Sequence, residues 1–312
     1  MFEPVPATKP TMYFLGVSTG ASSIMRIFPA WAETLGLEGA QLIGVDLPLG
    51  ADPARYRDWL AFVKEDPNSL GALVTSHKLD LVAAAGDLFD ELGPFATAMQ
   101  EVSAVYKRDG KLFGAAVDAE SSARSMDAFL PAAAFDGSEE VLVLGGGGAA
   151  LAIVWALLER STPPRRILVT DIDKQRLAHL RSVCGPRAGE TLLETMLVPA
   201  DTNADDLVAR LPPGSLVVNA TGMGKDRPGS PLAGTRSEDW PERGVAWELN
   251  YRGERLFLQQ AQGARAERQL QIEDGWRYFL LGWTRVIGLV FDVEIPPAGP
   301  LFDRLAELAN SS

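Results

Sequence analysis

Short apolar runs alternate with longer amphipathic segments along the chain of 312 residues. In the first part, apolar runs of β type predict strands at 11–17, 40–47, 71–76 and in a hairpin over 103–117 that turns at Asp109 and Gly110. Helical spacing fills the intervals at 22–36, 52–66 and 78–92, with Ser22 and Asp52 as expected caps. This alternation predicts an α/β unit with a mostly parallel sheet.

The alternation pauses after a predicted helix at 120–130 and restarts beyond a polar, small-residue stretch at 132–140. That stretch is interpreted as the crossing into a second α/β unit, which runs to about residue 274. The strands predicted for this unit are residues 141–145, 166–172, 194–200, 215–221 and 244–250. Two aromatic-rich helices, 274–291 and 300–309, follow it and are expected to pack on another part of the protein or to form a homodimer surface.

Composition narrows the class of partner. A net charge of −12 and a pI near 4.8 argue against nucleic acid and an anionic membrane. The single cysteine, Cys184, excludes an internal disulfide, and His77 and His179 lack the paired spacing of a zinc site, so no metal is expected. Residues 142–158 contain four glycines and fall short of a span of roughly 20 residues. With no signal-peptide pattern at the N-terminus, a cytoplasmic protein is expected.

A glycine-rich turn connects a predicted buried strand to a predicted helix. Gly145, Gly147 and Ala150 match the pattern G-x-G-x-x-A, and Gly148 and Ala149 lie in the same turn. The first glycine permits the tight turn, the second lets a pyrophosphate approach the backbone, and the small third residue lets the helix pack close to the strand. The helix N-terminus then presents free N–H groups to the phosphates. The motif predicts a dinucleotide site, although a glycine-rich turn that binds nothing is the alternative.

The next predicted strand ends at Asp171. A carboxylate there can accept hydrogen bonds from the adenosine ribose hydroxyls and would repel a 2′-phosphate. No arginine follows directly, since Ile172 and Asp173 come next, so NAD is predicted over NADP. The competing interpretation makes Asp171 or Asp173 a helix N-cap.

Lys78 and Asp118 each follow a predicted strand of the first unit. Ligands in α/β sheets bind outside the carboxyl ends of the strands, so both side chains are expected to face one crevice. A lysine beside a carboxylate can hold a substrate hydroxyl and pass its proton while hydride leaves the carbon. Taken singly, the lysine also fits a solvated surface charge and the aspartate a helix cap.

Six segments, in order, resemble the shikimate dehydrogenase family over nearly the whole chain. Residues 73–78 look like its catalytic-lysine segment, 104–122 like its substrate hairpin and catalytic aspartate, and 144–152 like its cofactor loop. Residues 219–224 are similar to its nicotinamide-side loop, 247–261 to the strand and helix that follow, and 274–283 to its closing helix.

The resemblance implies two α/β domains and a reaction. It predicts a substrate-binding, catalytic domain from residues 1–131 with 275–312 and a Rossmann NAD(P)-binding domain over 132–274. It also implies reversible NAD(P)-linked oxidation of a ring hydroxyl by Lys78 with Asp118. The further cofactor-binding residues that it predicts are Asn219, Thr221, Gly222, Met223 and Gly275.

This chain departs from the family where polar groups would hold the substrate. Ser18, Thr19, Ser22 and Ser23 stand near the family's N-terminal serine pair but with other spacing. The lysine segment is one residue shorter and lacks an asparagine and a proline, offering Leu73 and His77 instead. Tyr106 and Ala116 replace asparagines in the hairpin, and in the closing helix Gly282 replaces a glutamine while Trp283 adds bulk.

These exchanges predict a redirected substrate. Buried polar groups matched to a substrate discriminate by roughly 10⁴-fold or more. The expected partner is therefore a cyclic polyol or ketone other than shikimate, of the quinate, aminoshikimate or cyclitol type. The predicted substrate-binding residues are Ser18, Ser22, Thr75, Tyr106 and Tyr278. Arg285 fits a substrate contact and a surface position equally well, whereas His77 is expected to be exposed beside the crevice without a role.

A second hypothesis comes from another class of protein. The changed substrate ligands also fit an NAD-binding sensor that keeps the fold without turnover. Presence of both Lys78 and Asp118 favours the enzyme.

Overall fold

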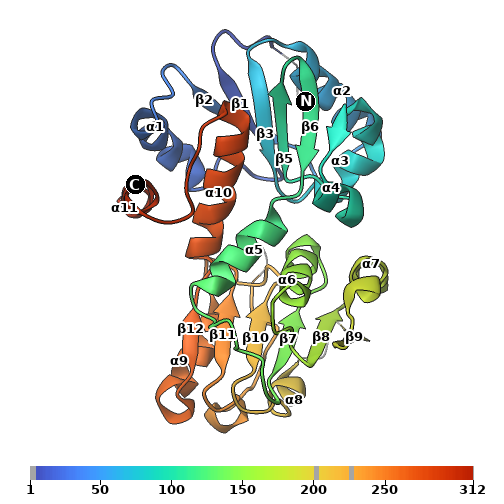
Figure 1. Cartoon of the computed structure of the whole chain (residues 1–312), viewed down its shortest axis with the longest axis vertical. Coiled ribbons are helices and arrows are strands. Elements are labelled where there is room, and N and C mark those ends of the chain that lie inside the picture. Colours follow the sequence, from blue (N-terminus) through green and yellow to red (C-terminus); the bar gives the residue numbers. More distant parts are fainter. Residues whose placement is uncertain (1–4, 200–203, 225–227, 312) are drawn as a thin grey trace. The chain divides into compact units, whose positions relative to one another are not determined.

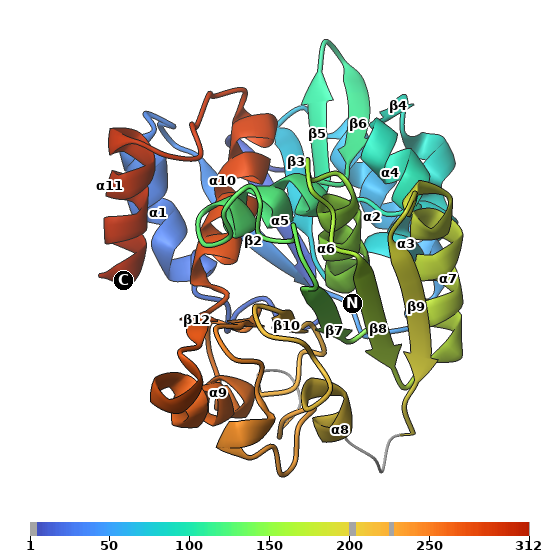
Figure 2. The ribbon, with the colours of Figure 1, turned by 60° about the horizontal axis from the view of Figure 1, so that its bottom comes forward.

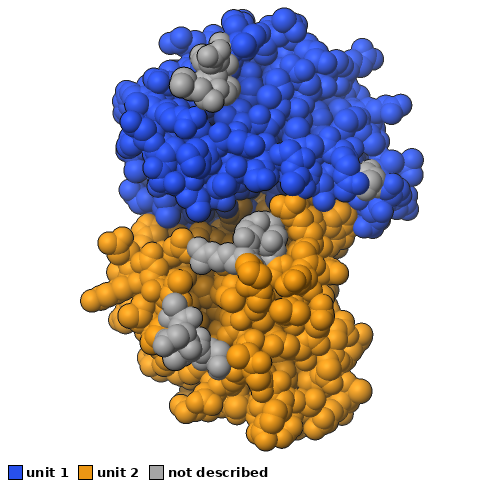
Figure 3. Space-filling view, turned by 180° about the vertical axis from the view of Figure 1, so that it is seen from behind, with its two compact units in different colours: residues 1–117, 280–312 blue, residues 118–279 orange. Residues whose placement is uncertain are grey.

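The computed structural model describes residues 5–199, 204–224 and 228–311. The chain forms two compact units, shown in Figure 3. Unit 1 comprises residues 1–117 and 280–312, and unit 2 comprises residues 118–279.

Unit 1 contains a six-stranded sheet in the order β2-β1-β3-β5-β6-β4 (Figure 1). β1 lies parallel to β2 and β3, whereas β5 runs antiparallel to both β3 and β6. β3 and β6 therefore point the same way, and their carboxyl ends lie at the same edge with one strand between them. The strands are β1 Thr11–Gly16, β2 Gln41–Asp46, β3 Ser69–Val74, β4 Glu91–Leu92, β5 Ala104–Arg108 and β6 Lys111–Ala115.

Helices cover both faces of this sheet. Consecutive side chains of a strand point to opposite faces. On β1, Tyr13 contacts Phe62 of α2 (Pro53–Glu65), and Phe14 contacts Trp283 of α10 (Trp276–Phe291). α1 (Ile24–Thr34) packs on the α10 side, where Figures 1 and 2 also show α11 (Pro300–Asn310). The short helices α3 (Lys78–Ala85) and α4 (Pro94–Met99) complete the unit.

Unit 2 contains six parallel strands in the order β9-β8-β7-β10-β11-β12. Numbered by sequence within the unit, this is the order 3-2-1-4-5-6 of the Rossmann fold, whose order reverses between β7 and β10. The strands are β7 Glu140–Leu144, β8 Arg166–Asp171, β9 Leu192–Leu197, β10 Leu216–Asn219, β11 Val245–Glu248 and β12 Gln271–Glu273. The helices are α5 Asp118–Asp127, α6 Gly148–Leu158, α7 Lys174–Cys184, α8 Asp205–Val208 and α9 Leu256–Arg268.

The core of unit 2 follows from strands that are buried on both faces. Leu142, Val217 and Ala246 belong to one apolar cluster with Val208 of α8 and Phe257 of α9. The alternate strand residues point to the opposite face, and Figure 2 shows α6 on the other side of the sheet from α8 and α9. Apolar runs without polar alternation are typical of such doubly covered parallel sheets.

The predicted α/β class and two mostly parallel sheets are confirmed, with corrections at some elements. The helix predicted over 78–92 ends at Ala85, because residues 91–92 instead pair with β6 as β4. Asp52 caps α2 as predicted, accepting from the N–H of Ala54 at 2.9 Å. The predicted cap at Ser22 is wrong, since Ser23 occupies the N-cap position of α1 and makes no side-chain cap bond.

The division into units differs from the predicted domain ranges. The sequence assigned residues up to 131 to the first domain, whereas α5 packs on α6 and groups with unit 2 from Asp118 onward. At the other end, the contact boundary falls inside α10, after Phe279. The domain ranges 1–131 with 275–312 and 132–274 stay a prediction. Within the described ranges, no helix combines the length and apolar character needed to cross a membrane.

Candidate functional site

The turn between β7 and α6 requires glycine at its first position. Gly145 has a φ of 102°, which residues with a side chain rarely adopt. A Cβ there would lie 2.7 Å from the carbonyl oxygen of Ala220. The N–H of Ala220 in turn donates to the carbonyl of Leu144 at 2.7 Å. The loops after β7 and β10 thus meet at the switch point, where nucleotides bind in this fold.

The N-terminus of α6 has the features of a pyrophosphate cradle. Gly147 occupies the N-cap position, and no heavy atom of the described residues lies within 4 Å of where its Cβ would stand. Gly148 and Ala149 are half-buried, whereas Ala150 is fully buried where the helix packs on the strand. Free N–H groups and the positive end of the helix dipole therefore face an open space, which fits a dinucleotide phosphate group.

Asp171 lies beside this turn and is held by backbone donors. One carboxylate oxygen accepts from the N–H of Gly146 at 2.6 Å, and the other from the N–H of Asp173 at 2.8 Å. Asp173 is the N-cap of α7 and accepts from the N–H of Gln175 at 2.8 Å. A carboxylate offers about four acceptor sites, so Asp171 keeps capacity for ribose hydroxyls while Asp173 takes the capping role.

The predicted nicotinamide-side loop, residues 219–224, begins at a buried asparagine. Oδ1 of Asn219 accepts from the N–H and the hydroxyl of Thr221 at 3.1 and 2.7 Å, and its Nδ2 donates to Glu248 at 2.8 Å. Thr221, Gly222 and Met223 are half-buried. The asparagine therefore shapes the loop from inside, while the next residues keep surface for a ligand.

Gly275 and Tyr278 lie at the start of α10, in the part that belongs to unit 2. A Cβ on Gly275 would lie 1.8 Å from the carbonyl oxygen of Leu249, so glycine permits a close backbone approach there. The Tyr278 ring meets Trp247 edge-on, with centroids 6.2 Å apart. These contacts give Gly275 a packing reason independent of a cofactor.

Lys78 is the first residue of α3, four positions beyond the end of β3. Its N–H donates to the carbonyl of Thr75 at 3.2 Å, and its own carbonyl accepts from the N–H of Val102 at 3.3 Å. Burial lowers the pKa of the Lys78 ammonium, and the negative charge of Glu101 acts in the opposite direction. This amine is thus in the environment of a lysine that can exchange a proton, not of a solvated surface charge.

Glu101 is a buried charge that the sequence did not identify. Its exposed fraction is 1%, and within the described residues neither carboxylate oxygen has a hydrogen-bond partner. Its negative charge acts on Lys78. A glutamate two residues before a β-type run was the available signal, but it did not reveal which side chain lies opposite.

Ser103, also missed, links the strand ends around this lysine. Its carbonyl accepts from the N–H of Val74 at 2.9 Å, and its hydroxyl accepts from the N–H of Val117 at 2.8 Å. The ends of β3 and β6 are therefore tied together by one residue at the start of β5. Asp118 follows Val117 directly, begins α5 and has an exposed fraction of 8%.

His77 is fully buried, which corrects the expectation of an exposed side chain. Its Nε2 lies 3.0 Å from the carbonyl of Leu47 and its Nδ1 lies 2.8 Å from the Tyr56 hydroxyl. Because a carbonyl only accepts, Nε2 donates to Leu47, while Nδ1 shares a hydrogen bond with the Tyr56 hydroxyl, which also lies 3.4 Å from Asp80. Burial raises the pKa of Tyr56 to about 12, with Asp80 adding to the effect. His77 thus anchors the N-cap position immediately before Lys78.

The other predicted substrate contacts have varied surroundings. Ser18 is exposed and Ser22 buried, whereas the neighbouring Thr19 donates its hydroxyl and N–H to Asp46 at 2.6 and 2.8 Å. The hydroxyl of Thr75 donates to the carbonyl of Leu15 at 3.2 Å, as a strand-end threonine that packs would do.

The hairpin and closing helix differ from the expected arrangement. Tyr106 lies within β5, stacked on Phe113 with centroids 5.3 Å apart, whereas Ser103 stands at the strand end beside the Lys78 segment. Trp283 is buried against Phe14 and so adds its bulk to the core of unit 1. Arg285 is exposed.

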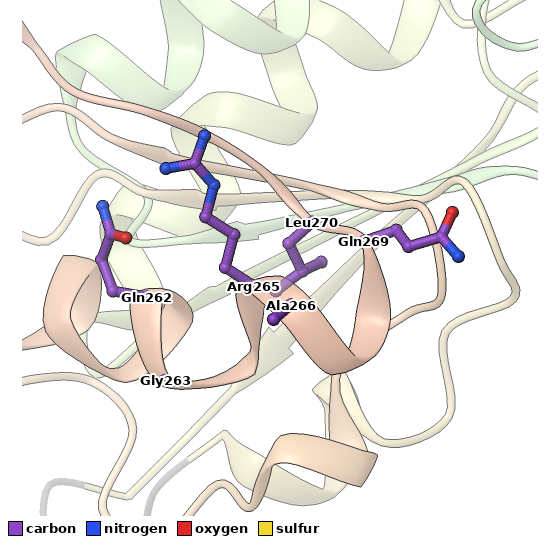
Figure 4. Close-up of a pocket in the computed structure, with 6 residues that line it drawn as sticks. All are labelled: Gln262, Gly263, Arg265, Ala266, Gln269 and Leu270. Carbon is purple, nitrogen blue, oxygen red and sulfur yellow. The ribbon is translucent and has the colours of Figure 1, made fainter.

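Two further features do not extend the site. In the described part of the chain, no cluster of three or more histidine, cysteine or acidic side chains could hold a metal ion. A shallow hollow runs along the outer side of α9 (Figure 4), and none of the predicted site residues lines it. Its lining residues are Gln262, Gly263, Arg265, Ala266, Gln269 and Leu270.

Comparison with known proteins identifies the family. No family model matches the chain. The chain is 30% identical over 225 residues to shikimate dehydrogenase (NADP(+)) of Afipia carboxidovorans, covering 72% of each protein. It is similar to shikimate 5-dehydrogenase of Thermus thermophilus, solved with NADP(H) and shikimate, with a TM-score of 0.70, 25% identity and coverage of 96% of this chain and 98% of that one.

A third comparison concerns the fold alone. Quinate dehydrogenase of Corynebacterium glutamicum, solved with NAD, superposes with a TM-score of 0.72 at 20% identity, covering 97% of this chain and 99% of that one. The sequence match to the Afipia carboxidovorans protein, the Rossmann strand order of unit 2 and the two α/β units agree with the six segments named from the sequence. The chain belongs to the shikimate dehydrogenase family.

Proposed function

We propose that the chain is a nicotinamide-dependent oxidoreductase that interconverts a ring hydroxyl and a ketone of a cyclic polyol. The observation that carries this proposal is the position of Lys78, a half-buried residue that follows β3 at the sheet edge where β6 also ends, together with the desolvation that lowers the pKa of its amine. A solvated surface lysine would have no such burial. Membership in the shikimate dehydrogenase family supports the same reaction class.

In this proposal Lys78 and Asp118 serve the proton of the reacting hydroxyl. Burial lowers the pKa of Lys78, so the neutral amine becomes accessible nearer neutrality than in a solvated lysine. The neutral amine accepts the hydroxyl proton during oxidation and returns it during reduction. Asp118 holds the amine and the hydroxyl in line, a role that its position directly after Val117 supports. The bound cofactor would accept or supply the hydride.

Different residues are proposed to contact the different chemical groups of the cofactor. The turn at 145–150 would hold the pyrophosphate, Asp171 the adenosine ribose, and residues 219–223 with Gly275 the nicotinamide end. NAD is proposed as the preferred form, because Asp171 is negatively charged beside the position of a 2′-phosphate and the exposed Ile172 follows it. The named relatives that use NADP make this preference a point to be measured.

The proposed substrate is a cyclic polyol other than shikimate. The substitutions at 116 and 282 exchange hydrogen-bonding groups, while the proposed proton-transfer pair is present. The buried Trp283 leaves the region next to Gly282 without an amide donor or acceptor from either side chain. Quinate, aminoshikimate and cyclitols are the candidates, and the fold likeness to a quinate dehydrogenase keeps quinate first on the panel.

A dinucleotide-binding sensor is the second candidate. The exchanged substrate groups favour it, whereas the environment of Lys78 favours the enzyme.

The proposal is tested by mixing purified protein with NAD or NADP and each member of a polyol panel and following reduced-cofactor absorbance. The expected result is turnover of a polyol other than shikimate, faster with NAD. Binding of NAD without turnover of any polyol or reduction of any ketone would support the sensor instead.

A further inference from the structure

A closed hydrogen-bond network joins the ends of β10 and β11 in unit 2. Glu248, the last residue of β11, is fully buried. One of its carboxylate oxygens accepts from Nδ2 of Asn219 at 2.8 Å, and the other accepts from the N–H of Asn250 at 2.8 Å. The network uses only residues of one unit, and both of its strands belong to the same sheet.

The same network fixes both sides of the loop that follows β10. Oδ1 of Asn219 accepts from the N–H of Thr221 at 3.1 Å, and the Thr221 hydroxyl accepts from the N–H of Met223 at 3.1 Å. From the other side, Nδ2 of Asn250 donates to the carbonyl of Met223 at 2.9 Å. Glu248 contacts both arms, through Asn219 and through Asn250.

The polarity of the network determines which residue can stand at 248. The backbone N–H of Thr221 can only donate, so Oδ1 of Asn219 must face it, and the amide Nδ2 must face residue 248. The backbone N–H of Asn250 also only donates. Residue 248 therefore has to present two acceptors, which a carboxylate does and an amide does not.

Burying the carboxylate of Glu248 costs folding free energy, because it removes the charge from water. Burial raises the pKa of Glu248 to about 7, whereas its bonds from Asn250 and Asn219 and the charge of Arg255 act in the opposite direction. Arg255 also pairs with Asp274 at 3.5 Å, so it is shared between two carboxylates. An apolar residue, as in the rest of β11, would avoid the desolvation cost and would leave the Asn219 amide without an acceptor.

We propose that Glu248 is a positioning residue for the nicotinamide cofactor, holding loop 219–224 in its binding shape through a network that requires two acceptors at position 248. The inference rests on the proposed function only in assigning this loop to the nicotinamide end. Glu248 itself is enclosed and touches no ligand in this account. Its effect passes through Asn219 and Asn250 to Thr221 and Met223.

The test compares two probes that share the adenosine half. NAD would contact both the 145–150 turn and the loop, whereas ADP-ribose lacks the nicotinamide and would contact the turn alone. Glu248→Gln places an amide donor against the amide of Asn219 or the N–H of Asn250, so NAD affinity should fall by about tenfold or more. ADP-ribose affinity should be unchanged. Glu267→Gln removes an equivalent charge from the exposed surface of α9 and should change neither.

A double substitution at positions 219 and 248 separates the effect of exchanging hydrogen-bond donors and acceptors from the effect of changing the packing. In Glu248→Gln with Asn219→Asp, the aspartate accepts from Thr221 and from the new amide at position 248, whose oxygen accepts from Asn250. NAD affinity of the double variant should return to within about threefold of the native value. Asn219→Asp alone sets two carboxylates face to face, so it should bind NAD more weakly than both Glu248→Gln and the double variant. Failure of the double variant to recover while the single variants are impaired would overturn the proposal.

Binding of the native protein supplies an independent check should the single variants not fold. The ratio of NAD to ADP-ribose affinity should rise as pH increases through about 7, because the ionised Glu248 is the better double acceptor. A ratio of NAD to ADP-ribose affinity that does not change with pH would contradict the proposed role of Glu248. An equal loss of affinity for both probes in Glu248→Gln would also contradict it. No turnover enters these measurements, so absence of polyol oxidation would count against the proposed reaction and leave this inference standing.

Discussion

The candidate site of unit 2 is formed mainly by backbone, whereas that of unit 1 is formed mainly by side chains. In unit 2, the turn after β7 is shaped by backbone conformation and by the absence of side chains, as at Gly145 and Gly147. In unit 1, the environment of Lys78 is made by buried side chains, namely the adjacent His77 and, from elsewhere in the chain, Tyr56 and Glu101. A backbone site suits a phosphate group common to all nucleotides, whereas a side-chain site can change with the substrate. If the proposed function is right, cofactor binding and substrate specificity can therefore change separately in this protein.

The largest expected effect comes from removing the Lys78 side chain in unit 1. Lys78→Ala should lower kcat by about 10²–10⁴-fold, because the reacting hydroxyl loses its proton acceptor. NAD affinity should stay the same, because the turn of unit 2 is untouched. Steady-state kinetics and an NAD titration measure the two effects, with Lys111→Ala, an exposed lysine of β6, as the control. An active Lys78→Ala enzyme would remove the proposed role.

A second substitution acts on the unit 2 side. Asp171→Asn removes the negative charge but offers only one acceptor to the N–H groups of Gly146 and Asp173, so both cofactors should bind more weakly. The ratio of NADP to NAD affinity should rise by about tenfold or more, since repulsion of the 2′-phosphate is relieved. Fluorescence titration with each cofactor measures the ratio. If the native protein already prefers NADP, the assignment of Asp171 is wrong.

Glu248 links pH to stability in unit 2. Its folded-state pKa of about 7 lies above the ordinary value of 4.5, so its stabilising contribution is complete below pH 4.5 and is lost as pH rises through about 7. The loss approaches roughly 3 kcal/mol of unfolding free energy. Urea unfolding of the native protein and of Glu248→Gln between pH 5 and pH 8 measures it. The variant should show a smaller decrease, and identical pH curves would contradict the burial argument.

A smaller effect tests the support of Lys78. Tyr56→Phe removes the hydroxyl that is hydrogen-bonded to Nδ1 of His77, leaving a buried ring nitrogen without that partner. The unfolding free energy should fall by about 1–3 kcal/mol. Tyr106→Phe is the comparison in the same unit, because its ring stacks on Phe113 and that contact would be retained. Equal losses from both variants would show that the Tyr56–His77 bond has no special part.

Glu101→Gln should change the pKa of Lys78 in a direction that can be stated in advance. Its negative charge raises the pKa of Lys78 against the effect of burial, so its removal should lower that pKa further. Competitive labelling of the amine at a series of pH values, read by peptide mass, reports the change without turnover. During oxidation, the activity limb should move to lower pH, since the neutral amine is the active form. An upward shift would contradict the electrostatic account.

The sequence revealed what is encoded locally. Most strands were recognisable from short apolar runs, the turn after β7 from closely spaced glycines, and the cap at Asp52 from its position before a helix, whereas the short strands β4 and β12 were not predicted. Strand pairing overrode local helical spacing at 86–92, because residues 91–92 lie beside β6.

What escaped the sequence depends on contacts between distant positions. His77 was expected to be exposed because nothing in its neighbours shows Tyr56, which lies 21 residues away in sequence. Ser103 acquires its role from Val117, 14 residues away. Glu248 gave a weak signal, a charge inside an otherwise apolar strand, which only the network with Asn219 explains. Tertiary partners of this kind have no periodic signature.

We propose that this chain oxidises a cyclic polyol by using Lys78. The most direct measurement follows NADH formation by native protein and by Lys78→Ala, in parallel, with quinate, shikimate, aminoshikimate and several cyclitols. The account predicts turnover of a polyol other than shikimate by the native protein and its loss in the variant, with NAD still bound. Equal rates in both proteins, or NAD binding with no turnover by either, would contradict it.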